Sequence, residues 1–295
     1  MAATAVTAPA AVSARPGRSS RPGQRRAAVI SHGILTLYAI CVLVPLLFVV
    51  YLSVKSLSGI LATPTALPDR IHTENYTQAW SSADLGRYLI NTVVVAGVTV
   101  AVVLLLSSLA AYVIARYHFR GNQLLYLFFV SGLALPIQII ALPLFILMRQ
   151  LGLLDTLPSL ILVFAAGGMS FSVFLLVNFM RSIPMELQEA AVVDGAGPIQ
   201  VYWHVVLPLV RPALGIVAIF EFINAWKEFF LPLLLIQSTN NMTVSVGVQS
   251  FQGEFDTQWQ LLLAALVIVS LPTIIGALFV TKQLRRNLLS GGIKM

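Results

Sequence analysis

Six long apolar runs constrain the fold of this chain more than any other feature of its sequence. They cover approximately Gly33–Val54, Leu89–Ile114, Leu124–Met148, Leu157–Phe179, Leu209–Leu235 and Leu261–Thr281. Each is close to the ~20 residues with which a helix crosses ~30 Å of hydrocarbon. Because lipid offers no partner for backbone polar groups, runs of this length are expected to be helices rather than barrel strands. The sequence therefore predicts an all-α polytopic membrane protein with six transmembrane helices.

The composition agrees with a membrane protein and argues against nucleic-acid binding. Hydrophobic residues make up 58% of the 295 residues and charged residues only 10%, whereas soluble domains carry about 25% charged residues. The net charge of +7 comes from cations that cluster between the apolar runs, where they orient a chain in the bilayer. Cys41 is the single cysteine, so no internal disulfide is possible.

The distribution of Lys and Arg predicts the orientation. One side of the predicted membrane carries Arg15, Arg18, Arg21, Arg25, Arg26, Arg116, Arg120, Arg181, Arg211, Lys282, Arg285, Arg286 and Lys294. The other side carries only Lys55, Arg70, Arg87 and Arg149, apart from Lys227 within the fifth run. Since cytoplasmic loops hold the excess of cations, we expect both termini and the polar loop after the fourth run to be cytoplasmic.

The first 27 residues differ from the rest of the chain. They are rich in Ala, Pro, Ser and Arg and contain no acidic residue, so we expect a disordered basic cytoplasmic tail before a membrane domain at residues 28–295. A secretory signal is the obvious alternative, but the following apolar run is too long and lacks an A-x-A site. An organellar transit peptide is a second alternative.

A polar segment between the fourth and fifth runs, Arg181–Pro208, has the pattern of an ordered structure. Pro184 suits a first helical turn, and Glu186 and Glu189 favour the positive end of a helix dipole. Apolar and small residues then recur at helical spacing, and Gly195 is a suitable stop. We predict a short helix over roughly Met185–Asp194, outside the bilayer, whose small alanine surface lets another protein approach closely.

This segment resembles the EAA loop of binding-protein-dependent ABC importer permeases. Glu189-Ala190-Ala191, Gly195 and Leu207-Pro208 match the motif at every spacing, with Val205 where the family usually has Ile. In that family the loop forms the coupling helix that inserts into a cleft of the cytoplasmic ATPase. The resemblance implies that the ATPase-coupling residues here are Glu189, Ala190, Ala191, Asp194, Gly195, Leu207 and Pro208.

The fifth run narrows the resemblance to the maltose-type (MalG-like) carbohydrate permeases. FINAWKEFFLPLL, beginning at Phe222, is similar to their F-x-x-x-W-N-x-F-x-x-P-L signature, with Lys227 where Asn or Asp is usual. The ending LLSGGIKM is similar to that subfamily's C-terminal tail, with Ile293 and Met295 as departures.

Polar residues inside the fifth run are candidates for a functional site. A charge at mid-bilayer costs ~2.5–3.5 kcal/mol on insertion scales, so such residues normally face protein or a water-filled path. Glu221, Asn224 and Glu228 recur on one helical face, and Lys227 lies off it, toward the outer end. These four residues line either the translocation path or the interface with a partner permease. The alternative is structural: Glu221 and Lys227 are buried partners of neighbouring helices, or Lys227 and Glu228 snorkel outward.

The sequence offers no enzyme chemistry. It contains no G-x-x-x-x-G-K-[ST], so the chain has no P-loop of its own. His32, His72, His118 and His204 are scattered and make no convincing metal cluster. We expect no catalytic residue, metal or cofactor, and ATP hydrolysis in a separate chain.

The resemblance implies a transport subunit of a bacterial inner membrane. Its partners would be a second permease subunit in a heterodimer, two ATP-binding cassette ATPase subunits and an extracytoplasmic solute-binding protein, with a sugar or related solute as substrate and no nucleic acid. Two alternatives are an ion-coupled secondary transporter that uses the fifth-run charges and a structural membrane scaffold. Neither would need the EAA spacing.

Overall fold

A computed structural model describes residues 22–253 and 256–291, with side chains over 29–253 and 256–276. The described residues form helices joined by loops, with a single isolated bridge between Gln252 and Thr257. The α-helices are α1 (Pro22–Ser53), α2 (Leu57–Ala62), α3 (Glu74–Ser82), α4 (Leu85–Arg116), α5 (Asn122–Ser131), α6 (Ile137–Gln150), α7 (Leu157–Arg181), α8 (Glu186–Val193), α9 (Pro198–Val201), α10 (Leu207–Lys227), α11 (Phe230–Leu235), α12 (Val244–Gly247) and α13 (Trp259–Gly291). Short 3-10 helices are η1 (Gly132–Ala134), η3 (Thr239–Asn241) and η4 (Val248–Phe251), and η2 (Tyr202–Val206) is a π-helical turn.

The predicted all-α membrane fold is confirmed. Five described helical segments are long and apolar enough to cross a bilayer: Val29–Ser53, Leu85–Arg116, Leu157–Arg181, Pro198–Lys227 and Trp259–Gly276. A sixth crossing is possible if Asn122–Ala134 and Ile137–Gln150 count together, but these two segments are bent by 104°. The third apolar run, which we expected to be one helix over Leu124–Met148, is therefore broken in the middle.

The break in the third run has a local cause. Pro136 has no N–H to continue a helix, and it restricts the preceding residue to extended backbone. Leu135 accordingly has φ −92° and ψ 111°, and Pro136 is the N-cap of α6. The chain tightens into η1 before this point and starts α6 in a new direction after it.

The fifth run also differs from its predicted bounds of Leu209–Leu235. The helix starts earlier, because α9, η2 and α10 form one continuous segment from Pro198 to Lys227. It ends earlier as well, since Glu228 turns to extended backbone and Leu235 lies in the separate α11. The side-chain Oε1 of Glu228 accepts from the backbone N–H of Phe230 (3.0 Å) and Leu231 (3.2 Å), which stabilises the start of α11.

The ends of the chain lie partly outside the described residues. Of the tail predicted over residues 1–27, residues 1–21 are not described, and α1 already begins at Pro22. The helical start agrees with a proline in the first turn, followed by Gln, Arg and Ala, which favour helices. Residues Met1–Val49 form a unit separate from Val50–Met295, and the sites below belong to the second unit. Ile293 and Met295, the departures in the C-terminal motif, also lie outside the described residues.

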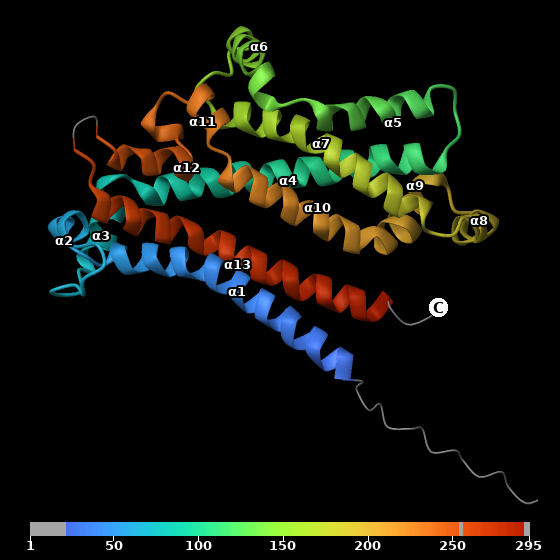
Figure 1. Ribbon diagram of the computed structural model, residues 1–295. Coiled ribbons are helices and arrows are strands. Elements are labelled where there is room, and N and C mark those ends of the chain that lie inside the picture. The colour runs from blue at the N-terminus through green and yellow to red at the C-terminus, as the bar shows by residue number, and fades with distance from the viewer. Residues whose placement is uncertain (1–21, 254–255, 292–295) are drawn as a thin grey trace, which may run out of the picture. The chain divides into compact units, whose positions relative to one another are not determined.

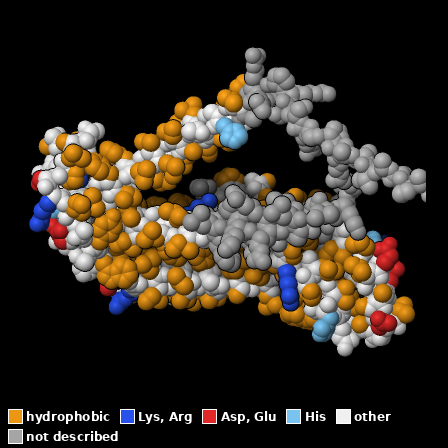
Figure 2. Space-filling view, turned by 90° about the horizontal axis from the view of Figure 1, so that it is seen from below, with side chains coloured by type: hydrophobic (Ala, Val, Ile, Leu, Met, Phe, Trp, Pro, Cys, Tyr) orange, Lys and Arg blue, Asp and Glu red, His pale blue; other side chains and the backbone are white. Residues whose placement is uncertain are grey.

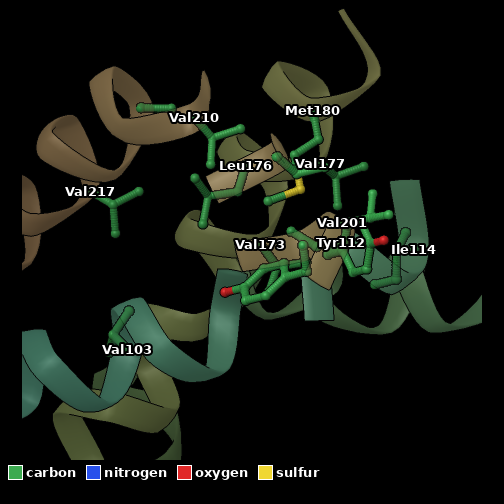
Figure 3. Close-up of a cluster of buried hydrophobic side chains, with 14 of the residues drawn as sticks. Val103, Tyr112, Ile114, Val173, Leu176, Val177, Met180, Val201, Val210 and Val217 are labelled. Carbon is green, nitrogen blue, oxygen red and sulfur yellow. The ribbon is translucent and has the colours of Figure 1, made fainter. Parts of the chain in front are cut away.

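The core of the second unit is built on α4, α7 and α10, which lie side by side in Figure 1. Figure 3 shows one buried cluster of this core, with Leu176 and Val177 of α7 lying between Tyr112 of α4 and Val210 of α10. Small residues let membrane helices approach closely, and α4 and α7, which pack against each other, bury five of them: Ser107, Ser108, Ala111, Ala165 and Ser172. Ser108 is hydrogen-bonded to Tyr202 of η2 and Ser172 to Glu221 of α10, so these residues also bring the fifth-run segment close.

The two ends of the bundle differ in structure. In Figure 1, α8 projects from one end, whereas α2, α3, α11 and α12 lie at the other. The space-filling view in Figure 2 shows many hydrophobic side chains on the described surface, and the acidic side chains that it shows among the described residues lie near the two ends. At the α2–α3 end, buried Lys55 donates its Nζ to the carbonyls of Thr63 (2.7 Å) and Ala66 (2.7 Å), which closes the loop after α2.

Candidate coupling helix and intramembrane polar cavity

The short helix predicted over Met185–Asp194 is α8, Glu186–Val193. Its end is a Schellman motif: the N–H of Ala196 donates to Ala191 O (2.9 Å) and the N–H of Gly195 donates to Val192 O (2.9 Å). The motif needs a left-handed residue, and Gly195 provides it with φ +87°. Gly195 therefore acts through the backbone conformation that ends α8.

The residues of the EAA motif do not all lie together. Glu189, Ala190, Asp194 and Gly195 are exposed around the end of α8, and Ala191 is half-buried against the core. Val193 beside them is 87% exposed, and Leu187 and Val192 are exposed apolar neighbours. Leu207 and Pro208 are half-buried at the start of α10, and Leu207 packs on the core. The motif thus combines a surface around α8 with the start of α10, which packs on the core, whereas the segments that pack against α8 itself are α9 and η2.

The polar residues of the fifth run are brought to one cavity, with one exception. A cavity of about 260 Å³ is lined by Glu221, Asn224 and Glu228 of the α10 end and by Thr99 of α4. Its walls also include the rings of Phe164, Phe171 and Phe220. Lys227 is exposed and does not line this cavity.

Glu221 is the most confined of these residues, with 4% of its surface exposed. Ser172 Oγ donates to its Oε1 at 3.3 Å, and a Cβ at Gly168 would stand only 2.4 Å from its Oε2. Within the described residues, no cation makes an ion pair with Glu221. The carboxyl group therefore occupies space left by a missing side chain on α7, with one hydroxyl partner.

Gly168 and Ser172 were not among the residues predicted from the sequence for this site. They stand four residues apart on α7, and small residues at this spacing are a signal of close helix packing in membranes. This spacing indicates that another helix packs against α7 at Gly168 and Ser172, but it does not identify the residue that fills the space.

A carboxylate clamp stabilises the loops at the α2–α3 end. Asp155 has φ +59°, and its Oδ1 accepts from the backbone N–H of Ser238 (2.9 Å), the backbone N–H of Gln237 (3.0 Å) and the hydroxyl of Ser238 (2.8 Å). These hydrogen bonds hold the pKa of Asp155 below its usual value, and the bond from the Ser238 amide has the largest effect. The clamp ties the loop before α7 to the loop after α11.

Comparisons with known proteins identify the family. Residues 103–289, more than half of the chain, match the binding-protein-dependent transport system inner membrane component family. The diacetylchitobiose uptake system permease protein NgcG of Streptomyces coelicolor is 37% identical over 260 residues, covering 88% of this chain and 86% of that protein. The melibiose/raffinose/stachyose import permease protein MelC of Bacillus subtilis is 30% identical over 275 residues, covering 92% and 99%.

A solved structure has the same fold. A chain of a bacterial ABC transporter involved in the import of the acidic polysaccharide alginate superposes with a TM-score of 0.79, at 23% identity, covering 89% of this chain and 98% of that one. Together with the candidate membrane spans, these matches agree with a transport subunit rather than an enzyme. The chain belongs to the binding-protein-dependent transport system inner membrane component family and is a multi-pass permease component of an ABC importer.

Proposed function

We propose that this chain is one permease subunit of an ATP-driven importer of a sugar or oligosaccharide and that α8 is its coupling helix. The carbohydrate substrate is supported by relatives named for the uptake of diacetylchitobiose and of melibiose, raffinose and stachyose. Membership of a binding-protein-dependent family argues against the ion-coupled secondary transporter, because such a transporter needs neither a binding protein nor an ATPase.

The geometry of α8 is the observation that supports coupling. The helix projects from one end of the bundle and exposes Leu187, Val192 and Val193 together with the small Ala190. Exposed apolar side chains on a polar segment outside the bilayer suit a protein interface. An ATPase that receives this surface would contact Glu189, Ala190, Asp194 and Gly195, while Ala191, Leu207 and Pro208 would lie behind it.

The polar cavity at the end of α10 is the candidate translocation path. Glu221, Asn224 and Glu228 offer hydrogen-bonding groups to a hydroxylated solute, and Lys227 faces outward where a second permease would pack. The complete importer would contain that second permease, two ATPases and an extracytoplasmic binding protein. A solved alginate transporter with the same fold carries a periplasmic protein bound to an alginate pentasaccharide. Both termini would lie in the cytoplasm, beside the ATPases.

The experiment that tests α8 compares two neighbouring glycines. Gly195→Ala forces a side chain into φ +87°, which costs about 1–2 kcal/mol, whereas Gly197→Ala is accommodated at φ −74°. We expect Gly195→Ala and Glu189→Lys to reduce the ATPase that co-purifies with the tagged chain and to reduce sugar uptake, while Gly197→Ala retains both. The amount of chain in the membrane should be equal in all variants. Equal ATPase recovery from Gly195→Ala, Glu189→Lys and the unchanged chain would refute the coupling role.

A further inference from the structure

The charged side chains that line the polar cavity at the end of α10 are acidic. The described lining contains the carboxyl groups of Glu221 and Glu228 and no Lys, Arg or His. Lys227 is next to Glu228 in the chain, but it is exposed and does not line the cavity. In the part of the chain that the structure describes, neither carboxyl group forms an ion pair. A solute that enters the cavity therefore meets carboxyl groups that no neighbouring cation of this chain compensates.

Each of the two carboxyl groups has one oxygen available to a solute. Oε1 of Glu221 accepts from the hydroxyl of Ser172 at 3.3 Å, and Oε1 of Glu228 accepts from the backbone N–H groups of Phe230 and Leu231. Neither Oε2 has a hydrogen-bond donor among the described residues, and neither is closed off from solvent. The two glutamates are seven residues apart in the sequence, which corresponds to about 10 Å along a helix axis. A solute with several hydroxyl or ammonium donors matches this pair of acceptors, whereas an anionic solute is repelled by it.

The apolar wall of the cavity favours the same kind of solute. It includes the rings of Phe164, Phe171 and Phe220. The centroids of the Phe171 and Phe220 rings lie 4.0 Å apart, with an angle of 32° between the ring planes. The face of an aromatic ring is electronegative, so it attracts a cation or the C–H groups of a sugar ring more than an anion. An apolar wall with a few polar groups is also the usual construction of a site for a small organic ligand.

We propose that Glu221 and Glu228 make this cavity select neutral sugars and amino sugars over sugars that carry a carboxylate, sulfate or phosphate group. The inference rests on the translocation path proposed above, and it names the class of solute that this path admits. The phenylalanine rings pack against the apolar face of the sugar ring, and the two carboxyl groups accept from its hydroxyl or ammonium groups. An acidic sugar would bring a further negative charge to carboxyl groups that have no cation beside them.

The rates at which charged reagents modify a cysteine in the cavity test its electrostatic preference. Gly167→Cys places a thiol on the cavity lining, at a position where a Cβ meets nothing within 4 Å. Cys41→Ser removes the only other cysteine of the chain. The full chain is purified with its partner subunits and reacted separately with two methanethiosulfonates, one carrying a trimethylammonium group and one a sulfonate. Mass spectrometry of this chain then gives the ratio of the two rates. We expect Glu221→Gln combined with Glu228→Gln to lower the ratio of the cationic to the anionic rate about tenfold, which corresponds to ~1.4 kcal/mol.

Matched variants separate the cavity from a general charge effect. Asp69→Asn removes a carboxylate from an exposed residue that does not line the cavity, so it should leave the ratio at Gly167→Cys unchanged. A thiol at the exposed position Thr65→Cys reports the intrinsic reactivity of the two reagents, and the glutamine changes should not affect its ratio. The glutamine variants also guard against a folding defect, because each keeps a side-chain oxygen as acceptor for Ser172 or for the backbone at Phe230.

Three sugars with the same ring connect this preference to the solute. Glucosamine, glucose and glucuronate are added at equal concentrations, and the rate of modification at Gly167→Cys is measured again. Glucosamine and glucose should slow the reaction more than glucuronate does, because the carboxylate of glucuronate is repelled by the two glutamates. In the variant with both glutamine changes, glucuronate should slow the reaction as much as glucose.

Several results would overturn the proposal. A thiol at position 167 that reacts with neither reagent would show that solutes do not reach the cavity. An unchanged ratio after both glutamine changes would remove the carboxyl groups as the cause, and a faster reaction of the sulfonate would indicate a cation of the second permease in the cavity. Equal slowing by the three sugars, or by none, would show that the cavity does not discriminate between them. These rates are measured without transport, so they are independent of the uptake and ATPase recovery that test the proposed function.

Discussion

The contact between Gly168 and Glu221 predicts how Gly168→Ala changes the free energy of unfolding. A Cβ at position 168 would lie 2.4 Å from Glu221 Oε2, 2.8 Å from its Cδ and 3.2 Å from its Oε1. Oε2 is the far end of a flexible side chain, so the carboxyl group can swing into the cavity that it borders, but it then loses its hydrogen bond with Ser172. Loss of one such bond costs about 0.5–1.5 kcal/mol, so Gly168→Ala should destabilise the protein by roughly that amount.

The preceding residue supplies the control. A Cβ at Gly167 meets nothing within 4 Å, so Gly167→Ala should be neutral or stabilise α7, since alanine favours a helix over glycine by about 0.8–1 kcal/mol. The two variants are compared with the unchanged chain by the midpoint of thermal unfolding in detergent. We expect Gly168→Ala to unfold at a lower temperature and Gly167→Ala at the same or a higher one.

A double variant assigns the effect to the carboxyl group. In Gly168→Ala combined with Glu221→Ala, the new methyl group occupies space that the carboxyl has left. The two changes should therefore be non-additive, with a coupling of about 0.5–3 kcal/mol, as for residues in contact. Equal midpoints for the two glycine variants, or strict additivity of the pair, would show that Glu221 does not lie against Gly168.

Other contacts give shorter predictions. Asp155→Asn tolerates the positive φ but weakens the clamp, so amide hydrogen exchange at Ser238 should accelerate. The pKa of Asp155 is lowered in the folded state, so its contribution to stability is fully present above the unfolded pKa of about 3.9 and is lost only as the pH falls through the lower folded pKa. Amide exchange at Ser238, corrected for the intrinsic exchange rate, should therefore not change between about pH 7 and 5. Lys55→Met removes the donor to two loop carbonyls and should expose the loop after α2 to protease, whereas Lys227→Met, at an exposed position, should not. Glu221→Gln keeps an acceptor for Ser172 and should lower sugar uptake without lowering ATPase recovery; unchanged uptake would remove Glu221 from the translocation path.

Local signals explain why the short helix could be predicted so closely. The expected bounds Met185–Asp194 and the observed bounds Glu186–Val193 differ by one residue at each end. The start follows a proline and carries glutamates in its first turn, and the end needs a left-handed residue, which Gly195 provides. These determinants lie within a few residues of the helix, so the sequence alone contains them.

The broken third run shows what hydropathy cannot predict. Leu124–Met148 is apolar apart from Ser131 and Gln138, and apolarity predicts burial in lipid without predicting the direction of the helix. Pro143 lies inside the continuous helix α6, whereas Pro136 ends one segment and starts another. The break follows from the extended backbone of Leu135 before Pro136, and the direction that α6 then takes depends on its neighbours, which include α11, almost a hundred residues later in the chain.

The polar cavity and the burial of Arg116 depend on tertiary packing to different degrees. Helical spacing placed Glu221, Asn224 and Glu228 on one face, because that relation is internal to a single helix. The partners of Glu221 come from α7, where the small-residue spacing of Gly168 and Ser172 is the one hint in the sequence. Arg116 was assigned a side of the membrane from its charge, but its burial beneath α8 follows from the packing of α4 against a segment almost seventy residues later.

The continuity of the segment Pro198–Lys227 has a mechanical consequence. At 1.5 Å per residue, its 30 residues form a rod about 45 Å long. One end begins directly after the loop that closes α8, and the other end carries Glu221 and Asn224. Under the coupling role proposed for α8, a push on that helix would reach this rod as a tilt, and the tilt would displace the residues of the polar cavity. The π-helical turn Tyr202–Val206 lies near the α8 end of this rod, and such turns inside α-helices are frequent at functional sites.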